Sequence, residues 1–206
     1  MKNKWIILIP VSLAVLSILM GCTKNETKYF ADTTSNGLAI FSNTGNNILT
    51  GDVNGLVWRT QNRVTGGFLS RSTSEVYLTK TTYDSSIHLL VITWYGGTQN
   101  FQYGYDFISL YLSVPSNFSH SDLDSLNGKR LEIDSTKGYF LGSISEISNN
   151  YEIGTGSIYF NRFSYDPTVT TGDTGRLSGL LEADFPDFKF TNGRFDDELT
   201  IEQIQF

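Results

Sequence analysis

Residues 107–114 read FISLYLSV, and their side chains alternate between two sets. Ile108, Leu110, Leu112 and Val114 form one set, and the residues between them form the other. Successive residues of a β-strand point to opposite faces of the sheet, so the four aliphatic side chains share one face. The stretch therefore predicts a half-buried strand whose aliphatic face packs on a hydrophobic core.

The rest of the chain repeats this pattern in short runs that turn residues separate. The sequence contains 14 Phe, 11 Tyr and 19 Gly, and only residues 121–128 have the features of a short helix, with Ser121 as its N-cap. Asn54-Gly55 predicts a tight hairpin turn, because these residues tolerate positive φ angles. We therefore expect an all-β fold, a single antiparallel β-sandwich or barrel-like domain of about ten strands with at most one short helix.

Three segments of the chain allow more detailed predictions. The nearly continuous apolar run Ile87–Trp94 indicates a strand covered on both faces. In residues 157–165, simple alternation places Phe160 and Phe163 on opposite faces. A connection through Pro186 and a turn at Thr191–Arg194 is expected before the last strand. Besides 107–114, the predicted strands are Val76–Thr81, Ile87–Trp94, Lys129–Asp134, Tyr139–Ile147, Tyr151–Gly154, Ser157–Tyr165, Leu177–Phe185 and Phe195–Ile204.

The amino terminus has the parts of a secretory signal peptide. Lys2 and Lys4 make its start positive, residues 5–20 form an apolar run, and the small residue Gly21 stands before Cys22, the only cysteine. The run contains a proline and two serines and is shorter than the roughly 18 apolar residues of a membrane-spanning helix. A cleaved signal segment, residues 1–21, is therefore expected.

Residues 19–22, LMGC, resemble the lipobox of bacterial lipoproteins. The resemblance implies cleavage before Cys22, a diacylglycerol joined to its thiol and an acyl chain on its new amino group. Two or three chains would anchor the protein stably in a membrane, because each buried methylene contributes about 0.8 kcal/mol. Thr23 stands where inner-membrane lipoproteins of enterobacteria carry Asp, so the outer membrane is expected, on its cell-surface or its periplasmic side.

The remaining chain divides into a tether and one domain. Residues 22–36 are polar and aperiodic after Cys22, which predicts a flexible tether, and residues 37–206 are expected to form the β domain. The formal charge of −6 becomes −8 once Lys2 and Lys4 are removed. Such an acidic chain disfavours nucleic acid as a partner.

The sequence offers little for catalysis, metal or cofactor binding. His88 and His120 are the only imidazoles, and a metal site on both would need carboxylates or water as further ligands. Asp196 and Asp197 are adjacent on a predicted strand, so they point to opposite faces and do not form the facing pair that glycoside hydrolysis requires. We therefore expect no metal, no cofactor and no enzymatic activity, with a hydrolase as the less favoured alternative.

Aromatic and amide side chains gather around the Gly-rich stretch after residue 94. Ring faces take the apolar faces of sugars and amides meet their hydroxyl groups, while a protein partner would use the same rings as hot spots. The alternative is that the rings cap one end of the domain. The candidate contact residues for a glycan or a protein ligand are Trp94, Tyr95, Gln99, Phe101, Tyr103 and Tyr105. A second functional class is a structural or assembly partner of another envelope protein.

Three motifs resemble a family of small Gram-negative lipoproteins that carry a β-sandwich domain of unknown function. They are the stretches DVNGLVW at 52–58, GRLSG at 175–179 and TNGRF at 191–195. The resemblance covers residues 51–95 and 155–200. It implies a β-sandwich and no chemistry, so no catalytic residue is carried over.

Replacement of Cys22 tests the lipid anchor. Cys22→Ala removes the thiol that would carry the diacylglycerol, so we expect the protein to leave the membrane fraction and to lose its label from radioactive fatty acid. Membrane fractionation and labelling of cells that express each form measure both effects. A wild-type protein without lipid label, and a variant that stays fully membrane-bound, would contradict the assignment.

Overall fold

The computed structural model describes residues 38–60, 76–82, 87–98, 106–145, 147–148, 150–166, 168–169, 174–200 and 204–206. The predicted signal peptide, Cys22 and the tether lie outside these ranges. Within them, no helix has the length and apolar character needed to cross a membrane.

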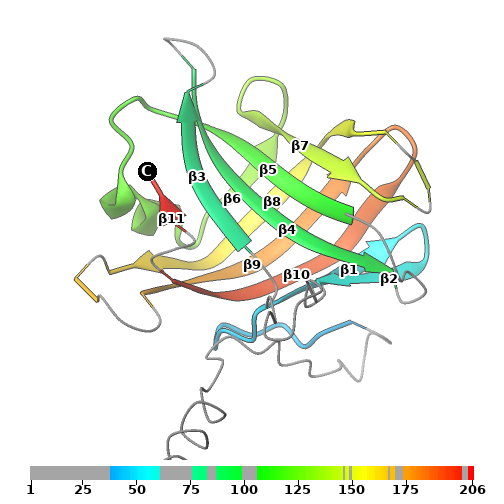
Figure 1. Ribbon diagram of the computed structural model, residues 1–206, viewed down its shortest axis with the longest axis horizontal. Coiled ribbons are helices and arrows are strands. Elements are labelled where there is room, and N and C mark those ends of the chain that lie inside the picture. Colours follow the sequence, from blue (N-terminus) through cyan, green and yellow to red (C-terminus); the bar gives the residue numbers. More distant parts are fainter. Residues whose placement is uncertain are drawn as a thin grey trace, which may run out of the picture.

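The described residues form eleven strands and one short 3-10 helix, η1 (Figure 1). The prediction of an all-β domain with at most one short helix is therefore confirmed. The elements are β1 Ile48–Val53, β2 Leu56–Thr60, β3 Val76–Thr82, β4 His88–Thr98, β5 Asp106–Val114, η1 His120–Leu126, β6 Arg130–Ile133, β7 Gly138–Ser143, β8 Glu152–Tyr165, β9 Gly175–Asp184, β10 Lys189–Leu199 and β11 Ile204–Gln205.

Eight strands close into an antiparallel barrel. Each pairs with the next in the order β1, β2, β4, β5, β7, β8, β9, β10, and β10 pairs again with β1. The other three strands lengthen this wall: β3 continues the edge of β4 beyond β2, β6 continues the edge of β8 beyond β7, and β11 pairs in parallel with β3. Of the two architectures expected, the barrel is the one observed.

Side chains fill the inside of the barrel, as an eight-stranded wall requires. Ile108, Leu110 and Leu112 of β5 are at most 5% exposed, which confirms the core face predicted for this strand. Two indoles and five phenyl rings are fully buried with them: Trp58, Trp94, Phe140, Phe160, Phe163, Phe190 and Phe195.

The expectation that β4 is covered on both faces is wrong. Leu90 and Ile92 are fully buried, but Val91, Thr93 and Tyr95 alternate with them and are only half-buried. The wall of a barrel has one covered side, so an apolar run in it still has an outward face. β4 is nevertheless central in the sheet, since β5 pairs along one edge and β3 and β2 share the other.

The two Asn-Gly pairs of the sequence have different roles. Asn54 (φ 48°) and Gly55 (φ 84°) join β1 to β2 in the predicted hairpin turn. The turn expected at Thr191–Arg194 is absent: these residues belong to β10, where Asn192 (φ 54°) forms a bulge against β9. The chain reverses at Pro186-Asp187, which belongs to the predicted connection. A positive φ serves a turn and a bulge equally well, so local sequence does not separate them.

The segments 151–154 and 157–165, predicted as two strands, are one strand of 14 residues. Thr155 and Gly156 continue the pairing with β9, opposite Asp184 and Ala183. A register shift between Phe160 and Arg162 then places Phe160 and Phe163 together in the core, although strict alternation would separate them. Other bounds differ as well: β4 continues to Thr98, β7 ends at Ser143, β10 begins at Lys189, and the segment predicted to end at Ile204 is divided between β10 and β11.

The predicted short helix is present with a different N-cap. It starts after Ser119, whose backbone N–H donates to the Asp122 carboxylate at 2.8 Å. An acidic residue at the third helical position reaches back to the N-cap, so Asp122 selects Ser119 rather than Ser121. Leu123 and Leu126 bury the helix against the core at one end of the barrel.

A segment ahead of β1, residues 38–47, lies along the outside of β10; we call it the strap. The carboxylate of Asp196, which is 3% exposed, accepts hydrogen bonds from the backbone N–H groups of Thr44, Gly45 and Asn46 at 3.3, 2.8 and 3.2 Å. The Asn46 side-chain amide, at 2.9 Å, and the Ser42 hydroxyl donate to the same carboxylate. Successive N–H groups that converge in this way form an anion-binding nest.

Replacement of Asp196 tests this attachment. Asp196→Asn keeps the size of the side chain but loses the charge that the five donors share, so we expect the free energy of unfolding to fall by about 2 to 3 kcal/mol. Urea denaturation measures the effect. Asp184→Asn is the control: it removes an exposed carboxylate that pairs with Lys189, and a loss under about 1 kcal/mol is expected. Equal losses in both variants would contradict a special role for Asp196.

Candidate functional site

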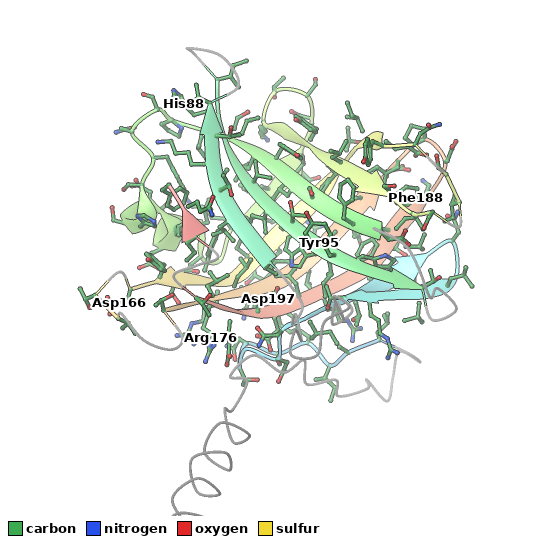
Figure 2. The ribbon with its side chains drawn as sticks, in the orientation of Figure 1. His88, Tyr95, Asp166, Arg176, Phe188 and Asp197 are labelled. Atoms are coloured by element: carbon green, nitrogen blue, oxygen red, sulfur yellow. The ribbon has the colours of Figure 1, made fainter. Side chains whose placement is uncertain are left out.

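Two of the aromatic candidates, Trp94 and Tyr95, lie on β4 and point to opposite sides of the barrel wall. Trp94 is fully buried inside, and its ring centre lies 5.3 Å from that of Phe195. Tyr95 lies outside, half-buried, on the wall that faces the viewer in Figure 2. Trp94 has no exposed surface for a ligand, so Tyr95 carries the aromatic hypothesis among the described residues. Gln99, Phe101, Tyr103 and Tyr105 lie outside the described residues.

The Trp94 indole makes a polar contact across the barrel interior. Its Nε1–H donates to Asp197 Oδ2 on β10 at 3.0 Å, and both residues are almost completely buried. Asp197 Oδ1 has no hydrogen-bond partner in the described part of the chain. Asp196 faces the strap on the other side of β10, so the two carboxyl groups point apart as predicted for adjacent strand residues.

Burial changes the ionisation of this carboxyl group. Removal from water raises the pKa of Asp197 to about 8; the indole hydrogen bond opposes this shift and the nearby charge of Asp196 adds to it. Asp197 is therefore mostly protonated in the folded protein at neutral pH. The group is enclosed in the core, so we assign it to stability rather than to catalysis.

An aromatic face covers the outside of β4, β5 and β7. Tyr95 stands directly opposite Phe107 on β5, with ring centres 6.2 Å apart. Tyr151, just before β8, places its ring centre 5.6 Å from that of Phe107 and is 74% exposed. These three rings form one end of the face.

A second group of rings lies further along the same strands. Tyr111 of β5 and Tyr139 of β7 are register partners, and their rings stack with centres 4.6 Å apart and planes 9° from parallel. Phe107 and Tyr111 are four strand residues apart, which corresponds to about 13 Å. Between the two groups, the hydroxyls of Thr93 and Ser109 share a hydrogen bond of 2.8 Å. The aromatic face thus has two ring groups, and the row between them runs from Thr93 and Ser109 to Leu141 and Ile153.

Sequence reasoning named one residue of this face, Tyr95, and missed the others. Tyr111 lies on the outward side of β5, but Tyr139 and Tyr151 lie far along the chain. They join the face only through the pairing of β5 with β7 and of β7 with β8. The sequence shows which aromatic residues point outward from each predicted strand. It does not show which strands are neighbours, so these residues could not be grouped into one face.

The histidines make separate contacts. His88 Nδ1 lies 3.2 Å from Thr82 Oγ1 on the neighbouring strand. The His120 ring packs against Tyr165 and Phe206, with ring centres 4.9 and 4.3 Å away, and partial burial lowers its pKa. In the described ranges, no three His, Cys, Asp or Glu side chains are grouped so that they could hold a metal ion.

Comparison with known proteins gives no match: no family model, no curated protein and no solved structure is similar to this chain at a significant level.

The raised pKa of Asp197 predicts a dependence of stability on pH. Between about pH 4 and pH 8 the folded protein keeps a proton that the unfolded chain has released, so the free energy of unfolding should fall as pH rises. The slope contributed by this group is at most about 1.4 kcal/mol per pH unit. Asp197→Asn keeps an acceptor for the Trp94 indole without a titrating proton, so its profile should be flatter. Urea denaturation at several pH values measures both profiles.

Asp184→Asn serves as the control for this measurement because its carboxylate is exposed and its side chain lies outside the core. It should keep the wild-type slope. Identical slopes for the wild type and Asp197→Asn would show that Asp197 does not hold a proton in the folded state.

Proposed function

We propose that this chain is a lipid-anchored, non-catalytic binding module of the outer membrane that holds a glycan on its aromatic face. The signal peptide and Cys22 motif support the anchor. The observation that carries the binding role is the pair of ring groups, Tyr95-Phe107-Tyr151 and Tyr111-Tyr139, on one side of three adjacent strands.

The form of this face suits an extended ligand. Each ring group offers apolar surface to the C–H face of a sugar, and the row between them offers the half-buried hydroxyl of Thr93. A separation of about 13 Å between the groups exceeds one sugar ring, so an oligosaccharide is required to contact both.

The alternative function is docking to another envelope protein. Ile153, which is 66% exposed, and half-buried Leu141 are register partners beside the ring groups. Aliphatic side chains of this kind contribute to protein interfaces in which Tyr and Phe act as hot spots. Two measurements distinguish these functions. Co-purification of a stoichiometric protein would indicate docking, and saturable binding of a glycan would indicate the glycan role.

A double substitution tests the glycan role. Tyr95→Ala with Tyr151→Ala removes two of three rings at one end of the aromatic face, so affinity for a bound oligosaccharide should fall at least about tenfold. A glycan array probed with the full-length protein in detergent, followed by titration calorimetry, measures the affinity.

Leu56→Ala is the matched control, since Leu56 is 47% exposed in the β1–β2 hairpin, away from this face. It should bind as the wild type does. Unchanged oligosaccharide affinity in the double variant, at an unchanged melting temperature, would eliminate the aromatic face as the glycan site. A stoichiometric protein that co-purifies with the wild type and not with the double variant would favour the docking alternative.

A further inference from the structure

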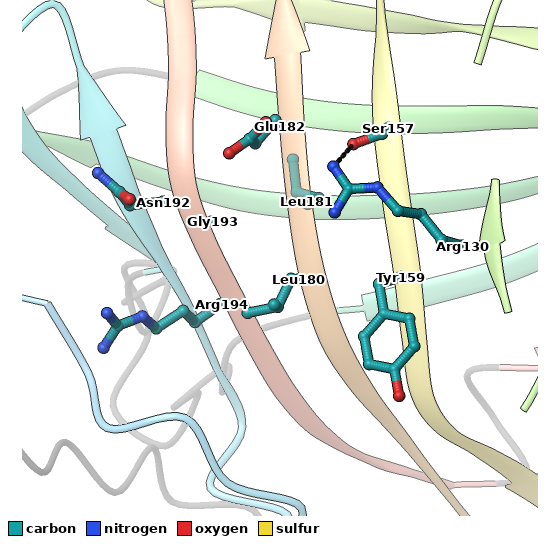
Figure 3. A pocket seen from close by; sticks show the side chains of 9 residues that line it. All are labelled: Arg130, Ser157, Tyr159, Leu180, Leu181, Glu182, Asn192, Gly193 and Arg194. Atoms are coloured by element: carbon teal, nitrogen blue, oxygen red, sulfur yellow. Dashed lines mark hydrogen bonds between the residues drawn. The ribbon is translucent and has the colours of Figure 1, made fainter. Parts of the chain in front are cut away.

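A small pocket lies on the outside of the barrel where β6, β8, β9 and β10 run side by side (Figure 3). The pairing registers place four outward residues in one row across these strands: Arg130, Tyr159, Leu180 and Arg194. Beside this row, Ser157 of β8 stands opposite Glu182 of β9. The pocket has a volume of about 190 Å³. None of these residues belongs to the aromatic face.

Neighbouring residues fix the arginine side chains at the pocket. Arg130 Nη2 donates to Ser157 Oγ at 2.8 Å, and Arg130 Nε lies 3.4 Å from Glu132 Oε1. Arg194 Nη1 donates to the Ala39 carbonyl of the strap at 3.0 Å. Arg130 Nη1 makes no hydrogen bond to any residue that the structure describes. Arg130 is thus oriented and still has a donor to offer.

Glu182 supplies the pocket with a negatively charged hydrogen-bond acceptor. Figure 3 shows its carboxylate between the guanidinium of Arg130 and the amide of Asn192. Within the described ranges, Glu182 has neither a hydrogen bond nor an ion pair. Asn192 is held at the bulge by a 3.0 Å hydrogen bond from its Nδ2 to Asp52, which leaves its carbonyl oxygen as a second acceptor. The pocket therefore presents an oriented donor and a free acceptor side by side.

This combination restricts the chemistry of a ligand. A phosphate or sulfate only accepts hydrogen bonds, so it would suit Arg130 but be repelled by Glu182. An ammonium group only donates, so it would suit Glu182 and be repelled by Arg130. A hydroxyl group donates and accepts, and a ring that carries several hydroxyls can satisfy both side chains at once. The ring of Tyr159 and the 39% exposed side chain of Leu180 add apolar surface for C–H groups.

We propose that this pocket is a second, independent binding site, which recognises a single pyranose unit through Arg130 and Glu182 with Tyr159 and Leu180 beside the ring. Its volume is below the roughly 300 to 1,000 Å³ of sites that enclose a drug-sized ligand, so one sugar ring fits and the rest of a glycan lies over the open sheet. A free amino acid also combines a donor and an acceptor charge, so leucine serves as a competing ligand in the test.

The pocket and the aromatic face share no residue and lie on different parts of the barrel wall. In the cyclic order of the eight strands, β9 of the pocket is three strands from β5 of the aromatic face. Figure 1 shows β4 and β5 on the near wall and β8, β9 and β10 behind them. The two sites can therefore be occupied and tested separately.

Saturation-transfer NMR of the full-length protein in detergent micelles tests the pocket. The probes are the methyl glycosides of glucose, galactose, mannose, N-acetylglucosamine and glucuronic acid, with leucine and inorganic phosphate as the competing chemistries. We expect at least one glycoside to bind with an affinity in the millimolar range. Glu182→Gln and Arg130→Lys should each weaken this binding about tenfold, because the first removes the charged acceptor and the second removes the planar fork.

Two control variants show whether glycoside binding takes place in this pocket. Asp184→Asn removes an exposed carboxylate on the same strand and face, outside the pocket lining, and should leave glycoside affinity unchanged. Tyr95→Ala with Tyr151→Ala should also leave it unchanged, so failure of the aromatic-face proposal remains distinguishable from failure of this one. The assignment is overturned if no glycoside binds, if Glu182→Gln binds as the wild type does, or if leucine or phosphate binds more tightly than every glycoside.

Discussion

The buried carboxylate of Asp196 is the polar contact on which the position of the strap and the start of β1 depend. Asp196 lies opposite Ile48 where β10 pairs with β1. This pairing of the last with the first of the eight strands closes the barrel. Its five hydrogen bonds fix residues 42–46 immediately before β1 begins. Further along β10, Asn47 accepts a 2.8 Å hydrogen bond from the Glu198 N–H, and Glu198 pairs with Arg176 of β9 at 2.9 Å. The strands at this seam are thus aligned by charge as well as by backbone pairing.

The inside of the barrel is organised by the same strand. Asp197, the next residue, turns inward and meets the Trp94 indole from the opposite part of the wall. Trp94 shares the core side of β4 with the buried Leu90 and Ile92, and Tyr95 therefore faces out. Gly96, one residue further, leaves room for the Trp58 indole, since a Cβ there would stand 2.6 Å from that ring. Core packing and the position of the outer rings are therefore two results of one strand orientation.

Sequence patterns predicted the parts of this fold that depend on neighbours along the chain. The alternation of residues 107–114 and the Asn54-Gly55 turn are local properties, and both are observed. What could not be predicted depends on partners across the sheet: the bulge at Asn192, the joining of 151–154 with 157–165, and the choice between sandwich and barrel. The sites follow the same rule. Tyr95 was found because it lies in an aromatic segment, whereas Arg130, Tyr159 and Glu182 come from three strands and share no motif.

The strap also determines how a mechanical load would enter the barrel. The described structure begins at Leu38, and the strap lies between that residue and β1. A pull on the chain at Leu38 would act first on the contact of Arg194 with Ala39 and then on the donors clustered around Asp196. Because several of these hydrogen bonds end on one carboxylate, they would resist the pull together rather than one after another. Such a pull would therefore load the hydrogen bonds of the strap before it reached the seam between β1 and β10.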